Sequence, residues 1–104
     1  MTSEKINVYL ADVVADECEA ILTKAGFTVD NRPGLPADEA MKAIAAADAV
    51  VVRSSTTITD EMMGKAPKLK VIGRAGSGVD NIDVKAATSR GILVMNAPGE
   101  NTRS

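Results

Sequence analysis

The feature that most constrains the fold is a series of short, uninterrupted runs of apolar and largely β-branched residues. The clearest run reads Ala-Val-Val-Val at residues 49–52, and residues 71–72 and 92–95 repeat the pattern. Such runs are typical of strands buried on both faces of a parallel sheet, whereas half-exposed antiparallel strands alternate apolar and polar residues. Residues 6–10 and 27–29 add two further strands, so we expect five in total.

Helix signals fill the first two intervals between these runs. Asp16 can cap a helix that Glu19 supports three residues later and that Gly26 ends, and Pro36 opens an alanine-rich second helix. The apolar spacing predicts the inward-facing residues, which are Cys18, Ile21, Leu22 and Ala25 in the first helix and Met41 and Ile44 in the second.

Helix signals also fill the two later intervals. Thr59 precedes two acidic residues and can cap a short helix, while Asp80 and Asn81 can begin another that stops at Gly91. The complete order is therefore βαβαβαβαβ with short links, which implies right-handed crossovers. This order predicts an α/β fold: a flavodoxin-like, doubly wound sheet of five parallel strands in the order 2-1-3-4-5, with helices on both faces.

The composition agrees with one soluble globular domain. Of the 104 residues 45% are hydrophobic and 25% charged, enough to bury a core without disulfides or a structural metal. The net charge is −2, and one Tyr and one Phe leave almost nothing to stack on bases, so we expect no nucleic-acid partner. We also expect no membrane partner and a cytoplasmic location, since no apolar stretch is long enough to span a bilayer.

Cysteine, methionine and histidine usage narrows the chemistry. The single cysteine, Cys18, cannot form an internal disulfide and reads as a buried residue on a helix. The chain has no His, so it lacks the usual zinc ligands and the commonest acid–base group, and we expect no metal. Methionines beside apolar positions favour gap-filling in the core over a partner surface, and these are Met41, Met62, Met63 and Met95.

Two arginines follow neighbouring strands of the predicted sheet. Ligands of open parallel sheets bind beyond the carboxyl ends of the strands, where Arg53 and Arg74 stand. We expect both side chains to project toward one crevice, a pairing suited to a carboxylate or phosphate through bidentate hydrogen bonds. The alternative is two solvated arginines at the rim of the sheet.

A glycine-rich turn follows Arg74. Gly73, Gly76 and Gly78 allow the backbone to approach a ligand ahead of the predicted helix start at Asp80, where the helix dipole favours an anion. The order G-x-x-G-x-G is neither the dinucleotide fingerprint G-x-G-x-x-G nor a phosphate-binding P-loop. A plain strand-to-helix turn would have a similar sequence.

Asp12, at the end of the first strand, invites comparison with phosphoacceptor receiver domains. Those domains share this strand order and gather acidic residues around a divalent ion. The strand that should end in the phosphorylated Asp ends in Arg53 instead, which argues against that interpretation.

Three segments together resemble a known family. They are Val-Val-Val-Arg-Ser at 50–54, Gly-Arg-Ala-Gly-Ser-Gly-Val-Asp-Asn-Ile-Asp at 73–83, and Gly-Ile-Leu-Val-Met-Asn-Ala-Pro at 91–98 followed by Asn-Thr. In this order and spacing they resemble the D-2-hydroxyacid dehydrogenases, and specifically the D-3-phosphoglycerate dehydrogenase type. The arginine in Gly-Arg-Ala-Gly suits a substrate that carries both phosphate and carboxylate, so glycerate and formate relatives are second choices.

The resemblance implies a site and a reaction. It implies that 3-phosphoglycerate is oxidised at its 2-hydroxyl by hydride transfer to NAD, the first step of serine biosynthesis, with a His–Glu pair and a further Arg that this chain lacks. It also implies roles for six residues: substrate binding by Arg53, Ser54, Arg74, Gly76, Ser77 and Asn101, with Ser77 also at the cofactor edge.

The resemblance further implies that residues 1–104 are a single truncated substrate-binding (lid) domain without the NAD-binding domain. We expect such a chain to be inactive alone, to bind no cofactor, and to bind 3-phosphoglycerate weakly. Asn101-Thr102 is a helix-capping signal followed by only two residues, so we expect the chain to be cut where its next helix would begin. The face that a returning helix of the full chain would cover should be apolar, so we expect a homodimer through that face.

Two other functions stay open at this point. The chain could be a stand-alone binding or regulatory module that binds a small phosphorylated anion through Arg53 and Arg74. An intact enzyme of a different class would need acid–base groups that the sequence does not supply.

Overall fold

The fold is a five-stranded parallel sheet with helices on both faces, seen here in a computed structural model that describes residues 6–14, 16–53, 56–74 and 81–96. The strand order is β2-β1-β3-β4-β5, and every pairing is parallel. This confirms the predicted fold class and strand order. The strands are β1 (Asn7–Leu10), β2 (Thr28–Asn31), β3 (Ala49–Val52), β4 (Val71–Arg74) and β5 (Leu93–Asn96).

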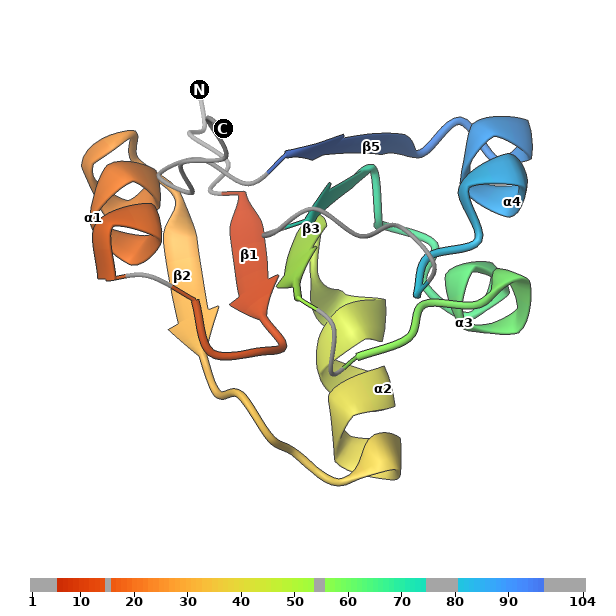
Figure 1. The fold of residues 1–104 in the computed structure, drawn as a ribbon, viewed down its shortest axis with the longest axis horizontal. Helices are drawn as coiled ribbons and strands as arrows, with labels where there is room; N and C mark the ends of the chain where they lie inside the picture. Colours follow the sequence, from red (N-terminus) through yellow and green to blue (C-terminus); the bar gives the residue numbers. More distant parts are fainter. Residues whose placement is uncertain (1–5, 15, 54–55, 75–80, 97–104) are drawn as a thin grey trace.

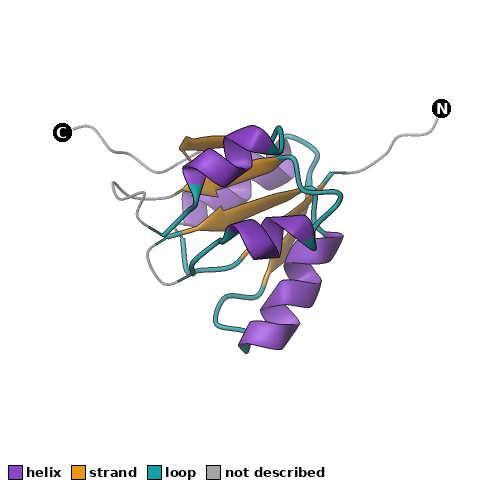
Figure 2. Ribbon diagram, turned by 90° about the vertical axis from the view of Figure 1, so that its right-hand side faces the viewer, coloured by secondary structure: helices purple, strands orange, loops and turns teal. Residues whose placement is uncertain are grey.

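The helices divide unequally between the two faces. Figure 1 shows α1 on one side of the sheet beside β2, and α2, α3 and α4 together on the other. In Figure 2 the strands run through the middle of the molecule with the helices around them. The helices are α1 (Asp16–Lys24), α2 (Ala37–Ala46), α3 (Asp60–Gly64) and α4 (Val84–Ser89).

Local chemistry explains where several helices begin and end. The Thr59 hydroxyl accepts a hydrogen bond from the Met62 N–H at 3.2 Å and so caps α3, as predicted. Gly26 and Gly91 lie beyond the ends of α1 and α4 with φ of 98° and 77°, the left-handed region where glycine carries no steric penalty. These positions confirm the predicted ends of both helices.

The core has two parts, one on each face of the sheet. The larger part joins Tyr9, Val50 and Ile72 to α2, α3 and α4, with Ile44 fully buried and Met41 packed against it as predicted. The smaller part packs Cys18 and other α1 residues on β1 and β3. Cys18 is fully buried, which confirms its predicted place in the core.

Some predicted burials are wrong. Ile21 is 40% exposed and Ala25 is exposed, because α1 turns a narrower face toward β1 than its apolar spacing suggested. Met62 and Met63 fill the core, but Met95 is 48% exposed. The methionine prediction therefore fails at Met95.

Among the described residues, no helix lies over one face of β4 and β5. Leu93 is 56% exposed and Met95 48%, so β5 is not buried on both faces as its apolar run predicted. Val94 packs against the core on the α2, α3 and α4 side, so its neighbours Leu93 and Met95 point to the α1 side, where α1 packs on β1 and β3. A groove of about 600 Å³ opens there between Phe27 and Met95. We call the apolar surface formed by Val71, Leu93 and Met95 the open face.

Candidate functional site

The two arginines stand at the carboxyl-end edge of the sheet. Arg53 directly follows β3, and Arg74 is the last residue of β4, where it pairs with Val52. Because side chains alternate along a strand, Arg74 leaves the sheet on the same face as Val52 and Ile72, the face covered by α2, α3 and α4. The Arg53 guanidinium instead reaches the β1–α1 link, where Nη1 donates to the Val13 carbonyl at 3.5 Å.

A buried carboxylate lies beneath Arg53. Asp12 is 6% exposed, and its Oδ2 accepts hydrogen bonds from the Arg53 N–H at 2.6 Å and the Thr56 N–H at 3.1 Å. Its Oδ1 accepts the Thr56 hydroxyl hydrogen at 2.5 Å. Three donors therefore compensate the burial of this charge, which would otherwise be costly.

A carboxamide holds the same segment from the other side. Asn81 Nδ2 donates to the Thr56 carbonyl at 2.7 Å and also to the Arg53 carbonyl. Next to it, the Ile58 N–H donates to the Asn81 carbonyl at 2.8 Å, and an isolated parallel bridge joins Ile58 to Ile82. The segment after β3 is thus tied to the segment after β4.

Arg53 differs from two other arginines of the chain in its charge environment. Arg32 forms two 2.7 Å hydrogen bonds with Asp30, and Arg90 pairs with Asp60 at 2.8 Å. Within the described ranges no carboxylate pairs with the Arg53 guanidinium, which is exposed. Its bond to Val13 lies at the outer limit for a hydrogen bond, so an anion can replace it at little cost.

Four of the six predicted site residues, Ser54, Gly76, Ser77 and Asn101, lie outside the described residues. Gly73 belongs to β4 rather than to the turn after it. The backbones of Arg53 and Arg74 lie at one edge of neighbouring strands, as the sequence predicted. The prediction that both side chains project toward one crevice is wrong in the described structure, because Arg74 leaves the sheet on the face of Val52 while the Arg53 guanidinium reaches the β1–α1 link.

The predicted start of the last helix is wrong. Helix α4 begins at Val84, and the carboxylate of Asp83 caps it by accepting the Ala86 N–H at 3.0 Å. Asn81 precedes the helix and binds the segment after β3 instead. An anion at this helix terminus would meet the Asp83 carboxylate, so the helix-dipole argument for the glycine turn loses its support.

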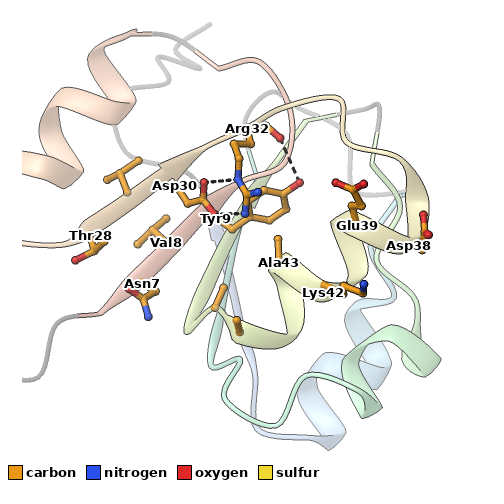
Figure 3. A pocket seen from close by; sticks show the side chains of 13 residues that line it. Asn7, Val8, Tyr9, Thr28, Asp30, Arg32, Asp38, Glu39, Lys42 and Ala43 are labelled. Carbon is orange, nitrogen blue, oxygen red and sulfur yellow. Dashed lines mark hydrogen bonds and ion pairs between the residues drawn. The ribbon is translucent and has the colours of Figure 1, made fainter.

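A second cavity lies away from this edge, between β1, β2 and α2. It measures about 680 Å³, and Figure 3 shows the Tyr9 ring inside it, between Arg32 and α2. Burial raises the pKa of the Tyr9 phenol above its ordinary value, and its hydroxyl donates to the Arg32 carbonyl at 3.3 Å. The Asp30 hydrogen bonds raise the pKa of Arg32, so this guanidinium is already engaged. Acidic side chains outnumber the basic ones around it, which disfavours an anion.

The described residues form neither a cluster of metal ligands nor a membrane-spanning helix. Across residues 6–14, 16–53, 56–74 and 81–96 no three acidic or cysteine side chains gather as metal ligands would. None of the helices in those ranges is long and apolar enough to cross a bilayer. Asp12 is the residue that suggested a receiver domain. Its carboxylate oxygens instead accept hydrogen bonds from Arg53 and Thr56.

Comparison with known proteins gives the family. The family profile described as "D-isomer specific 2-hydroxyacid dehydrogenase, catalytic domain" matches residues 8–104. The chain belongs to this family. Among sequence relatives, the D-3-phosphoglycerate dehydrogenases of Archaeoglobus fulgidus and Mycobacterium tuberculosis are 43% and 46% identical over 99 residues, covering 95% and 93% of the chain. The chain spans about a fifth of their length, 19% and 18%.

Solved structures agree with the fold. The NAD⁺-bound 3-phosphoglycerate dehydrogenase of Entamoeba histolytica matches with a TM-score of 0.77 and 33% identity, over 92% of this chain and 34% of that one. The PH0520 protein of Pyrococcus horikoshii matches with a TM-score of 0.80 and 31% identity, over 92% of this chain and 28% of that one. The D-lactate dehydrogenase of Escherichia coli, at 16% identity and a TM-score of 0.74, shares the fold.

Sequence reasoning missed the roles of Asp12 and Asn81. Asp12 stood out as an acidic residue at a strand end, and Asn81 as a helix start. The only signals were a polar Asp12 two residues beyond β1, and Arg53 and Thr56 beyond β3, the strand that pairs with β1 in the sheet. The partners are 41 to 44 positions away, which is why local patterns did not reveal them.

Proposed function

We propose that this chain is the substrate-side part of an NAD-dependent D-3-phosphoglycerate dehydrogenase and that it binds an anionic group of 3-phosphoglycerate at Arg53. The observation that supports it most is the exposed Arg53 guanidinium with no carboxylate partner in the described ranges, at the carboxyl-end edge where ligands of parallel sheets bind. The names of its relatives supply the substrate.

The chemistry of this edge suits a substrate with two anionic groups. A guanidinium offers paired N–H donors that match a phosphate or carboxylate. Because Arg53 and Arg74 leave the sheet on different sides, an anion that contacts both would lie over the ends of β3 and β4. Ser54, Gly76, Ser77 and Asn101 remain predicted contributors to the same site.

The described residues do not fit a dinucleotide. In folds that bind one, the first strand-to-helix link carries glycines that cradle the pyrophosphate. Here that link contains Asp12 and no glycine, so an acidic side chain stands where phosphates would lie. In the full-length protein, NAD would accept the substrate hydride when bound by other parts of the chain. Arg53 and the other residues at the carboxyl-end edge of this sheet would orient the substrate anion.

The 104 residues are proposed not to catalyse the oxidation alone. The reaction needs a group that takes the proton of the 2-hydroxyl, and His, the residue best suited at neutral pH, is missing from the sequence. The check is an assay of NADH formation from NAD⁺ and 3-phosphoglycerate with the purified chain. We expect none, and sustained turnover would contradict the proposal.

Calorimetric titration with 3-phosphoglycerate tests the binding itself. We expect weak binding that Arg53→Ala abolishes and that Arg53→Lys restores only in part, because an ammonium lacks the guanidinium fork. Arg90→Ala is the matched control, since Arg90 is already paired with Asp60. No heat at millimolar ligand would contradict the proposed site. Tight binding would favour the stand-alone regulatory module instead.

We also propose that a protein of these residues associates into a homodimer through the open face. Leu93 and Met95 present adjacent apolar side chains on a parallel sheet, a class of sheet that is normally covered on both faces. Two copies related by a two-fold axis would each cover the other's open face.

A further inference from the structure

We propose that Asp12 and Asn81 are positioning residues for the anion site: they fix the main chain at Arg53 and Thr56 so that the Arg53 guanidinium faces the substrate. This inference rests on the proposed function. Neither residue touches the substrate in it, and both act through Arg53.

The arrangement of hydrogen bonds carries the inference. Asp12 accepts from the N–H groups of Arg53 and Thr56, at 2.6 and 3.1 Å, while Asn81 donates to the carbonyls of the same two residues. Four backbone groups of two residues are thus held by one acceptor side chain and one donor side chain. The holding residues come from different segments, one after β1 and one after β4.

The side chain of Arg53 is held far less than its main chain. Its guanidinium makes one long bond to the Val13 carbonyl and is exposed. A fixed main chain with an available guanidinium lowers the entropy lost when an anion binds, because only the side chain has to be ordered. Fixing the main chain in this way therefore favours anion binding by the long Arg53 side chain.

Because Asp12 is negatively charged, the inference can be tested by whether its substitution raises or lowers the affinity for 3-phosphoglycerate. A carboxylate close to an anion site repels the anion, so its removal would tighten binding if charge alone mattered. If Asp12 positions Arg53, its removal weakens binding despite that gain. The two explanations therefore predict opposite changes in the affinity for 3-phosphoglycerate.

The experiment compares three variants. Asp12→Asn removes the charge and leaves a neutral amide oxygen as the acceptor for the two N–H donors, which weakens both hydrogen bonds. Asn81→Ala removes the donor to both carbonyls without a change of charge. Asp48→Asn is the matched control, because the Asp48 carboxylate accepts the Asn7 N–H at 2.9 Å and so joins β1 and β3 at the opposite edge of the sheet.

Titration with 3-phosphoglycerate at a temperature where each variant is fully folded by circular dichroism gives the first readout. We expect roughly tenfold weaker binding for Asp12→Asn and Asn81→Ala, and unchanged binding for Asp48→Asn, since small misplacements of binding groups carry large penalties. A structural role alone would lower the unfolding midpoint and leave the affinity of the folded protein unchanged. Binding as tight as in the unsubstituted chain, or tighter, overturns the inference.

Backbone ¹⁵N relaxation at Arg53 and Thr56 gives the second readout, which needs no ligand. We expect increased mobility of these two amides in both variants and none in Asp48→Asn. Unchanged mobility overturns the inference even where binding falls. If the unsubstituted chain binds no 3-phosphoglycerate, the proposed function fails, and relaxation alone decides whether the two residues fix Arg53. Should Asp12→Asn fail to fold, Asn81→Ala, at a half-buried position, supplies both readouts.

Discussion

The Thr56 hydroxyl donates a 2.5 Å hydrogen bond to the buried Asp12 carboxylate across 44 positions of sequence. Thr56→Val keeps the side-chain shape and removes the hydroxyl donor, which leaves the Asp12 carboxylate with two of its three hydrogen bonds. We expect the free energy of unfolding to fall by about 1–2 kcal/mol, the usual cost of an unmade buried hydrogen bond. Urea denaturation measures it. Thr57→Val at the exposed neighbouring position is the control, and an equal effect of both would contradict the role given to Thr56.

Stability should fall at alkaline pH because of Tyr9. Burial raises the pKa of this phenol, so the native state holds the proton more tightly than the unfolded chain, whose tyrosine titrates near about 10. The contribution to stability is complete below that pH and is lost as the pH rises through the native pKa. Urea midpoints measured across this range should decline more steeply in the unsubstituted chain than in Tyr9→Phe.

The same titration can be followed directly, because the chain has a single tyrosine. We expect tyrosinate absorption of the folded protein to appear at higher pH than that of the protein in urea. Lysines titrate in the same pH range but do not absorb as tyrosinate does, so the absorption reports on Tyr9 alone. Coincident absorption curves would show that burial does not raise the pKa.

The open face should control association. Leu93→Asp places a charge on the 56%-exposed position of this face, and we expect it to convert the dimer to a monomer in light scattering. Val84→Asp is the control, since Val84 is also exposed, at 40%, but lies on α4. A monomeric mass for the unsubstituted chain would rule the dimer out.

The cap of α4 should contribute measurably to stability. Asp83→Ala removes the acceptor for the Ala86 N–H, and we expect a loss of about 1 kcal/mol in the free energy of unfolding. Lys85 is exposed and lies in the first turn of the same helix. Lys85→Ala should change the free energy of unfolding by less than about 0.5 kcal/mol. Chemical denaturation of both variants decides this, and similar values would argue that Asp83 does not cap the helix.

Features with local signals were predictable from the sequence. The run at β3 identified a buried parallel strand, Thr59 identified the cap of α3, and Gly26 and Gly91 identified two helix ends. Together with short links, these local signals leave few topologies for a sheet of this kind, so the strand order followed.

Features that depend on distant residues were not predictable. Asn81 has the composition of a helix start, but Asp83 caps α4 and Asn81 bonds to carbonyls 25 and 28 positions away. Leu93 and Met95 have the composition of buried strand residues, but burial also requires a covering element, which the sequence of the strand does not specify. At the candidate site, the positions of Arg53 and Arg74 after their strands were predictable, while the residues that hold the main chain of Arg53 were not.

The hydrogen bonds around Arg53 connect segments that follow β1, β3 and β4, so this edge exists only when the sheet has assembled. An anion that binds there binds the native state and has no comparable site on the unfolded chain. By mass action it must then raise the denaturation midpoint as its concentration increases. Ligand selectivity can therefore be ranked by thermal shifts alone, without any turnover.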